Sequence, residues 1–89
     1  MATRRNPACT RSWTRLRNAL HRVIVLRQGS IGEVATRTQE LLENATKESD
    51  PAFLGIGHTT VGYLVAKEIE IDMIEDVLCS LAKDHGYQL

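Results

Sequence analysis

Apolar residues recur at the three- and four-residue spacing of α-helices in three stretches of this 89-residue chain. The first stretch, residues 12–28, presents one apolar face made of Trp13, Leu16, Leu20, Val23 and Ile24. Ser12 is placed to cap its start, and Gly29 stands where a helix commonly ends. The spacing therefore predicts a helix over residues 12–28.

The second stretch is the most regular. Ser30 and Glu33 have the capping-box spacing S-x-x-E, in which the hydroxyl accepts a hydrogen bond from a free backbone N–H and the carboxylate reaches back to the cap. A single apolar stripe follows, made of Ile31, Val34, Ala35, Thr38, Leu41, Leu42 and Ala45. Charged residues lie mostly opposite this stripe, so the pattern predicts an amphipathic helix over residues 31–47.

Residues 47–58 interrupt the helical periodicity. Asp50-Pro51 disfavours a helical residue at position 50, and Gly55 and Gly57 keep the backbone permissive. We therefore expect a loop here, with its apolar side chains tucked onto the core. These are Phe53, Leu54 and Ile56.

The third stretch, residues 60–85, is apolar on more than one side. Its first part presents one apolar direction, and its second part presents another that is rotated most of the way round. A helix that is apolar nearly all round is normally buried, and two shorter helices can cover only part of it. The apolar surface left uncovered predicts a protein-partner or dimer face made of Leu64, Ile71, Ile74, Leu78 and Leu81. Complete coverage by the chain's own helices is the alternative.

Together these patterns predict an all-α fold: a small three-helix domain over residues 12–89, with a long C-terminal helix. Aromatic residues make up only 4% of the chain, so the core is expected to be aliphatic. A domain of this size has a marginal core, which favours a homodimer. Residues 1–11 are basic and lack periodicity, and we expect a flexible arm.

The zero net charge hides an uneven distribution. Residues 1–28 hold seven arginines and no acid, whereas residues 29–89 hold four basic residues and all eleven acids. One side of the last helix carries an acidic ridge, which we define as Glu68, Asp72, Glu75 and Asp76. Arg11, Arg15 and Arg22 have matching helical offsets, so the ridge is interpreted either as one half of an intrachain salt-bridge lattice or as a docking site for a basic partner.

The arginine-rich start also supports an alternative function, a small DNA- or RNA-binding protein. Its candidate phosphate contacts are Arg4, Arg5, Arg11, Arg15 and Arg17. Residues 30–38 resemble the opening helix of MerR-type winged-helix regulators. The sequence then continues the same helix without the turn and recognition helix of that family, so nucleic acid is the second choice.

Neither catalysis nor metal binding is indicated. His21, His58, His85, Cys9 and Cys79 have none of the spacings that zinc sites use, and the exposed acids lack a nucleophile beside them. We expect no cofactor and no enzymatic activity. The longest apolar run, residues 23–26, is too short to cross a membrane, and no secretion signal precedes it. We expect a cytoplasmic protein that makes no membrane contact.

The C-terminal region resembles TraM-type antiactivators, which bind LuxR-type quorum-sensing regulators. The shared features are Ile69-Glu70, Leu78, Leu81 and Gly86-Tyr87, with Tyr63 and Ala66 matching after a one-residue insertion. The resemblance implies a small helical dimer that binds a transcriptional activator and prevents its action, a role shared by QslA-like proteins. It also implies that Ile69, Leu78 and Leu81 are helix-packing or dimer positions. The predicted function is therefore a regulatory protein that sequesters another protein; a purely structural subunit is a further possibility.

Overall fold

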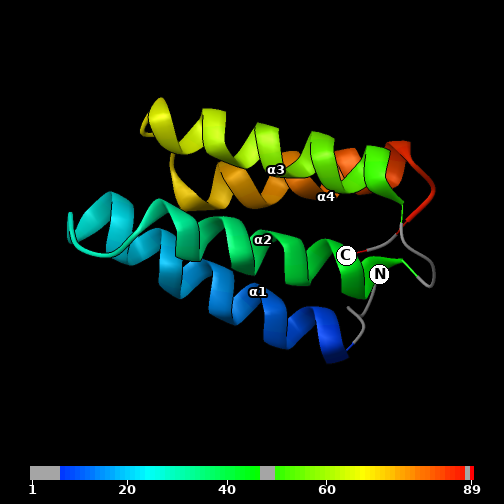
Figure 1. The fold of residues 1–89 in the computed structure, drawn as a ribbon, viewed down its shortest axis with the longest axis horizontal. Helices are drawn as coiled ribbons and strands as arrows, with labels where there is room; N and C mark the ends of the chain where they lie inside the picture. Colours follow the sequence, from blue (N-terminus) through cyan, green and yellow to red (C-terminus); the bar gives the residue numbers. More distant parts are fainter. Residues whose placement is uncertain (1–6, 47–49, 88) are drawn as a thin grey trace.

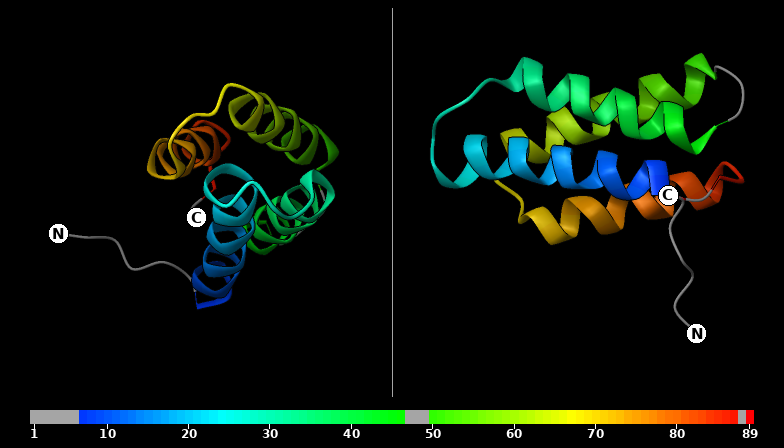
Figure 2. Two further views of the ribbon diagram at one scale, coloured as in Figure 1. Left: turned by 90° about the vertical axis from the view of Figure 1, so that its left-hand side faces the viewer. Right: turned by 90° about the horizontal axis from the view of Figure 1, so that it is seen from below.

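The computed structural model describes residues 7–46, 50–87 and 89, and these residues form an all-α bundle (Figure 1). The helices are α1 (Pro7–Leu20), α2 (Ile31–Ala45), α3 (Pro51–Ala66) and α4 (Ile71–Asp84), and a short π-helix, η1 (His21–Val25), continues α1. Seen end-on, the four α-helices follow one another around a shared core (Figure 2). The predicted all-α class is confirmed, but the described residues form four α-helices where three were expected.

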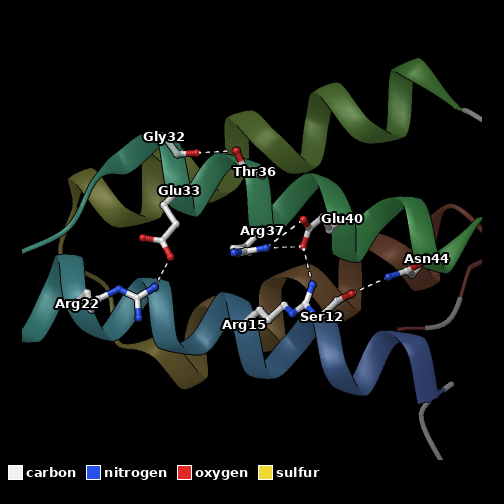
Figure 3. Close-up of polar contacts among 9 residues, drawn as sticks. All are labelled: Ser12, Arg15, Arg22, Gly32, Glu33, Thr36, Arg37, Glu40 and Asn44. Carbon is white, nitrogen blue, oxygen red and sulfur yellow. Dashed lines mark hydrogen bonds and ion pairs between the residues drawn. The ribbon is translucent and has the colours of Figure 1, made fainter.

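Helix α1 begins at Pro7, five residues before the predicted start. Proline suits the first position of a helix because its missing N–H would have no intrahelical partner there. Residues 7–11 are therefore not an arm, and Cys9 is fully buried in the core; residues 1–6 lie outside the described residues. Ser12 is not a cap either. It is buried inside α1, where its hydroxyl accepts a hydrogen bond from the side-chain amide of Asn44 at 2.6 Å (Figure 3).

Helix α2 confirms the predicted helix closely. The Ser30 hydroxyl accepts a hydrogen bond from the Glu33 backbone N–H at 3.1 Å. The Glu33 carboxylate is turned toward η1, where it pairs with Arg22 (Figure 3). Most of the predicted stripe faces the core; its fully buried members are Val34, Thr38, Leu41 and Leu42. Ile31 departs from the prediction, since it is 56% exposed at the first turn.

Helix α3 replaces most of the predicted loop. Asp50 is its N-cap, with a side-chain oxygen that accepts from the Phe53 N–H at 3.3 Å, and Pro51 occupies the first turn. Gly57 permits close packing, because a Cβ placed there would lie 2.3 Å from Cδ1 of Leu42 on α2. Phe53 is buried as predicted, whereas Ile56 is 43% exposed and does not tuck onto the core.

The predicted single helix over residues 60–85 is wrong. It is divided at residues 67–70, where Glu68 adopts a left-handed backbone conformation with φ 57°, and α3 and α4 pack against each other (Figure 1). The two apolar directions seen in the sequence belong to these two helices. Each helix turns its own apolar side inward, which explains why the direction rotated along the stretch.

The C-terminal residues close the bundle over the start of α3. The Tyr87 hydroxyl donates to the Asp50 carboxylate at 3.1 Å, and the Tyr87 ring lies 4.8 Å from the Phe53 ring, centroid to centroid. Gly86, with φ 80°, makes the turn after α4 that this contact requires. The inner side of α3 is thus fixed at its start by the cap, by Phe53 and by Tyr87.

Candidate protein-interaction surface

The residues predicted to form a partner face serve mainly to build the monomer. Ile74 and Leu78 are fully buried in the core of one chain, so neither can touch a partner while the bundle is intact. Leu64, Ile71 and Leu81 are half-buried and pack against the same core. The apolar surface that seemed excessive on one long helix is covered once α3 and α4 fold against each other.

The acidic ridge is largely matched by arginines of the same chain. Arg17 of α1 pairs with Asp72 at 2.9 Å and with Glu75, both on α4. Arg27 pairs with Glu68 at 2.8 Å across the two turns at one end of the bundle. These pairs agree with the intrachain salt-bridge interpretation, although the arginines that form them are not the three predicted.

The described basic residues of the nucleic-acid alternative all lie on α1. Arg4 and Arg5 lie outside the described residues, and Arg11 is exposed on α1. Arg15 lies 3.9 Å from the Glu40 carboxylate (Figure 3), and the guanidinium of Arg17 is held between two carboxylates. A guanidinium already matched by acids is poorly placed to neutralise a phosphate. Of these candidate contacts, Arg11 and Arg15 lie one turn apart on the same side of α1, whereas Arg17 is turned toward α4.

The histidines and cysteines do not converge. Among residues 7–46, 50–87 and 89, no three side chains of His, Cys, Asp or Glu are grouped so as to hold a metal ion. His21 and His58 are exposed on different helices, and His85 caps the end of α4 beside Phe53, at 5.5 Å between ring centroids. Cys9 is buried in the core, although the sequence placed it in the expected arm.

The most unusual surface of the described chain is the outward face of α3. We define this face as Ala52, Gly55, Ile56, Thr59, Gly62, Tyr63 and Ala66, all of which are exposed. They share one side of the helix at about 100° per residue, opposite the buried residues of α3. The exposed side of a solvated helix normally carries charge, yet α3 contains no Asp, Glu, Lys or Arg over its 16 residues.

Large and small residues divide this face lengthwise. Viewed down the helix axis, two large residues project about 50° to one side of Thr59 and form a ridge. They are Ile56 and Tyr63, which are 43% and 62% exposed. Gly55 and Gly62 lie about 50° to the other side, where an added Cβ at either would meet no neighbouring atom within 4 Å. The glycines therefore leave a groove beside the ridge that a second helix can approach closely.

The ridge side of the face borders a shallow groove between α3 and α4. Its floor is apolar and its rim carries two acids; the lining residues are Thr60, Asp76, Val77, Ser80, Leu81 and Asp84. Two residues singled out in the sequence, Asp76 of the acidic ridge and Leu81 of the partner face, meet in this groove. It extends the outward face of α3 onto α4 and adds negative charge along one edge.

Sequence reasoning missed this face because the first half of α3 was taken for a loop. The signal was nevertheless present, since residues 51–66 are uncharged and Asp50-Pro51 is an N-cap followed by a favoured first residue. Read as a helix, the stretch has an apolar inner side and an uncharged outer side. That combination is typical of a helix covered on both sides by protein.

In comparisons with known proteins, no family model, no curated protein and no solved structure matches the chain. Within the described residues, no helix is long and apolar enough to cross a membrane.

Proposed function

We propose that this protein is a small regulatory protein that sequesters another protein by binding one of its helices on the outward face of α3. We further propose that the partner is a LuxR-type transcriptional activator, which is the role implied by the resemblance to TraM-type antiactivators. The observation that carries the proposal is a 16-residue helix with no charged residue and an exposed outer face. Exposed apolar surface of this kind typically marks an interaction site.

The chemistry of the face defines the kind of segment that fits it. The helix is about 24 Å long and carries no Asp, Glu, Lys or Arg, and the Lys67 ammonium of its C-cap lies 5.7 Å from the centroid of the Tyr63 ring. Such a surface accepts an apolar helix, because away from Lys67 a buried charge would lose its hydration without gaining a partner. Helices dock into such surfaces through large side chains spaced along one side. Asp76 and Asp84, at the edge of the neighbouring groove, favour a partner whose flank is basic.

The residues that carry the TraM-type resemblance differ in their places in the structure. Ile69, Leu81 and Tyr87 pack against the core, and Glu70 is exposed before α4. Leu78 and Gly86 have structural roles, in the core and in the turn after α4. Tyr63 and Ala66 lie on the outward face of α3. Tyr63 and Ala66 support the proposed function, because neither side chain is buried in the core of the monomer.

The partner is first identified by photo-cross-linking in the native cell, with a photo-reactive residue in place of Tyr63 in the full chain. A protein linked at position 63, but not at position 36 on the exposed side of α2, would be identified and purified. Its affinity for the unmodified chain would then be measured by calorimetry. We expect Tyr63→Glu to weaken binding at least tenfold, because it removes the large ring of the ridge and puts a carboxylate, with only the Lys67 ammonium beside it, on a face that is otherwise uncharged. Thr36→Glu should leave binding unchanged.

Sequestration is tested separately in a transcription assay with the identified partner. The unmodified chain should lower activator-dependent transcription, Thr36→Glu should lower it equally, and Tyr63→Glu should not. A partner that binds both variants with the same affinity would show that the outward face of α3 is not the site. Leu78→Asp is unsuitable as a probe, because Leu78 is buried and a charge there would unfold the bundle.

A further inference from the structure

We infer that the outward face of α3 also binds a second copy of this chain, with the two α3 helices parallel and in register. This inference rests on the proposed function in one respect, namely that the face binds protein. It adds that the free regulator covers the face with itself. A partner helix then competes with the second copy for the same surface.

The first step is the arrangement of the ridge and the groove. Ile56 and Tyr63 are spaced by seven residues, and so are Gly55 and Gly62, so ridge and groove run along the helix for two turns. Each large residue stands next to a glycine at nearly the same height. The face therefore offers both halves of a ridge-into-groove contact at the same spacing.

The second step is symmetry. A two-fold axis parallel to α3 exchanges the two sides of the face, so the ridge of one copy lies over the groove of the other at equal heights. An antiparallel pair centred on Thr59 would instead set ridge against ridge and leave the two grooves facing each other. The division of the face thus selects the parallel arrangement, a self-complementary contact in which each copy uses the same residues.

The third step is charge. Every other helix of the described chain carries charged residues, but α3 carries none, so two α3 helices meet without like-charge repulsion. A helix that fits this face must be uncharged and must carry large side chains seven residues apart. Helix α3 itself has both properties. The central positions Ala52, Thr59 and Ala66 are small enough to let the two helices approach closely.

The size of the contact sets its strength. The outward face of α3 contributes seven residues, which is well below the roughly 20–30 residues that each partner contributes to a standard interface. We therefore expect a dimer that forms as the concentration rises and dissociates readily. Such a dimer shields the apolar face while leaving it open to exchange with the sequestered protein.

Sedimentation equilibrium on the full chain tests the association. The apparent mass should rise from the 10.0 kDa of one chain toward twice that value with concentration. Tyr63→Glu should remain monomeric at every concentration, and Thr36→Glu should associate like the unmodified chain. A concentration-independent monomer would overturn the inference, and so would a dimer that forms equally well with Tyr63→Glu.

Engineered cysteines test the arrangement. In the parallel pair, Ala66→Cys lies against its own copy, and so does Ala52→Cys, so each should form covalent dimers alone under mild oxidation. All chains in this test carry Cys79→Ser, because Cys79 is only half-buried. The parent chain and its Thr36→Cys variant are the controls and should not link, because Cys9 is buried and position 36 lies on α2. Cross-links that appear only when the two single-cysteine chains are mixed would indicate an antiparallel pair and overturn the inference as made.

The two proposals fail in different ways. If the chain stays monomeric but binds an identified partner through Tyr63, the inference is wrong and the proposed function stands. If it dimerises through Ala52 and Ala66 but neither the cross-link at position 63 nor the transcription assay reveals a partner, the proposed function is wrong and the inference stands.

Discussion

Helices α2 and α3 are neighbours of nearly equal length, and both bury one side in the same core, yet their outer sides differ completely. The outer side of α2 carries polar side chains that bond to one another, as between Arg37 and Glu40 or between Gln39 and Glu43. The outer side of α3 has no charge and two glycines in open space. The contrast indicates that α2 faces water, whereas α3 has an outer side suited to contact with protein.

The largest expected effect separates the inner from the outer side of α3. Phe53→Ala should lower the free energy of unfolding by about 3–5 kcal/mol, because the ring is fully buried and contacts Tyr87. Ile56→Ala, in the same helix, should cost less than about 1 kcal/mol in the dilute monomer. Urea denaturation at low protein concentration measures both. Similar losses for the two would mean that the outer face is part of the core.

The two classes of glycine in α3 give the next effect, and here the signs should be opposite. Gly57→Ala should destabilise the monomer by about 1–3 kcal/mol, because the new methyl group would collide with Leu42. Gly62→Ala should stabilise it by up to about 1 kcal/mol, since the position is open and alanine is the better helix former. Thermal unfolding of the dilute chain detects both shifts. A stability gain at position 57 would contradict the close packing of α2 and α3.

Much of the fold follows from local sequence patterns. The regular stripe and the Ser30 cap defined α2 almost to the residue, and the spacing of Trp13, Leu16 and Leu20 identified the buried side of α1. The bounds of α2 and the buried side of α1 both depend on residues that are close in sequence, so the spacing along the chain is enough to predict them. The all-α class follows from such patterns because helical spacing covers most of the chain. Residues 68–73 do alternate at the two-residue period of a strand, and in the structure they span the break after α3 and the first turn of α4.

The remainder depends on contacts that the linear pattern does not contain. Gly57 suggested a loop until its closeness to Leu42 on α2 showed why a helix needs glycine there. The division between α3 and α4 falls at Glu68, without the glycine or proline that usually marks such a break. The candidate site was hidden for the same reason, since the outward face of α3 exists only once residues 51–66 are helical. The apolar direction that rotates along residues 60–85 was the usable clue, because it indicates two helices.

The C-terminal ends of α2 and α3 also differ, and this difference predicts a smaller effect on stability. The cap residue after α2, Thr46, has an extended backbone, whereas the turn after α3 places Glu68 at φ 57°, where residues other than glycine are strained. Glu68→Gly should therefore raise the stability of the monomer by about 0.5–1 kcal/mol. Glu68→Ala is the matched control: it also removes the exposed pair with Arg27 but keeps the strain, so it should not stabilise. Equal results for the two would assign any change to the lost carboxylate.

The smallest expected effect concerns the charged side of α2. Arg37→Ala removes a contact of 3.1 Å to the Glu40 carboxylate, and ion pairs at this spacing on a helix contribute only about 0.2–0.5 kcal/mol. The loss should shrink further at high salt, which screens exposed charges. Partner binding should not change at all, since Arg37 lies on α2, away from the outward face of α3. A marked loss of partner binding in Arg37→Ala, with stability nearly intact, would move the interaction surface from α3 to α2 and reverse the contrast between the two helices.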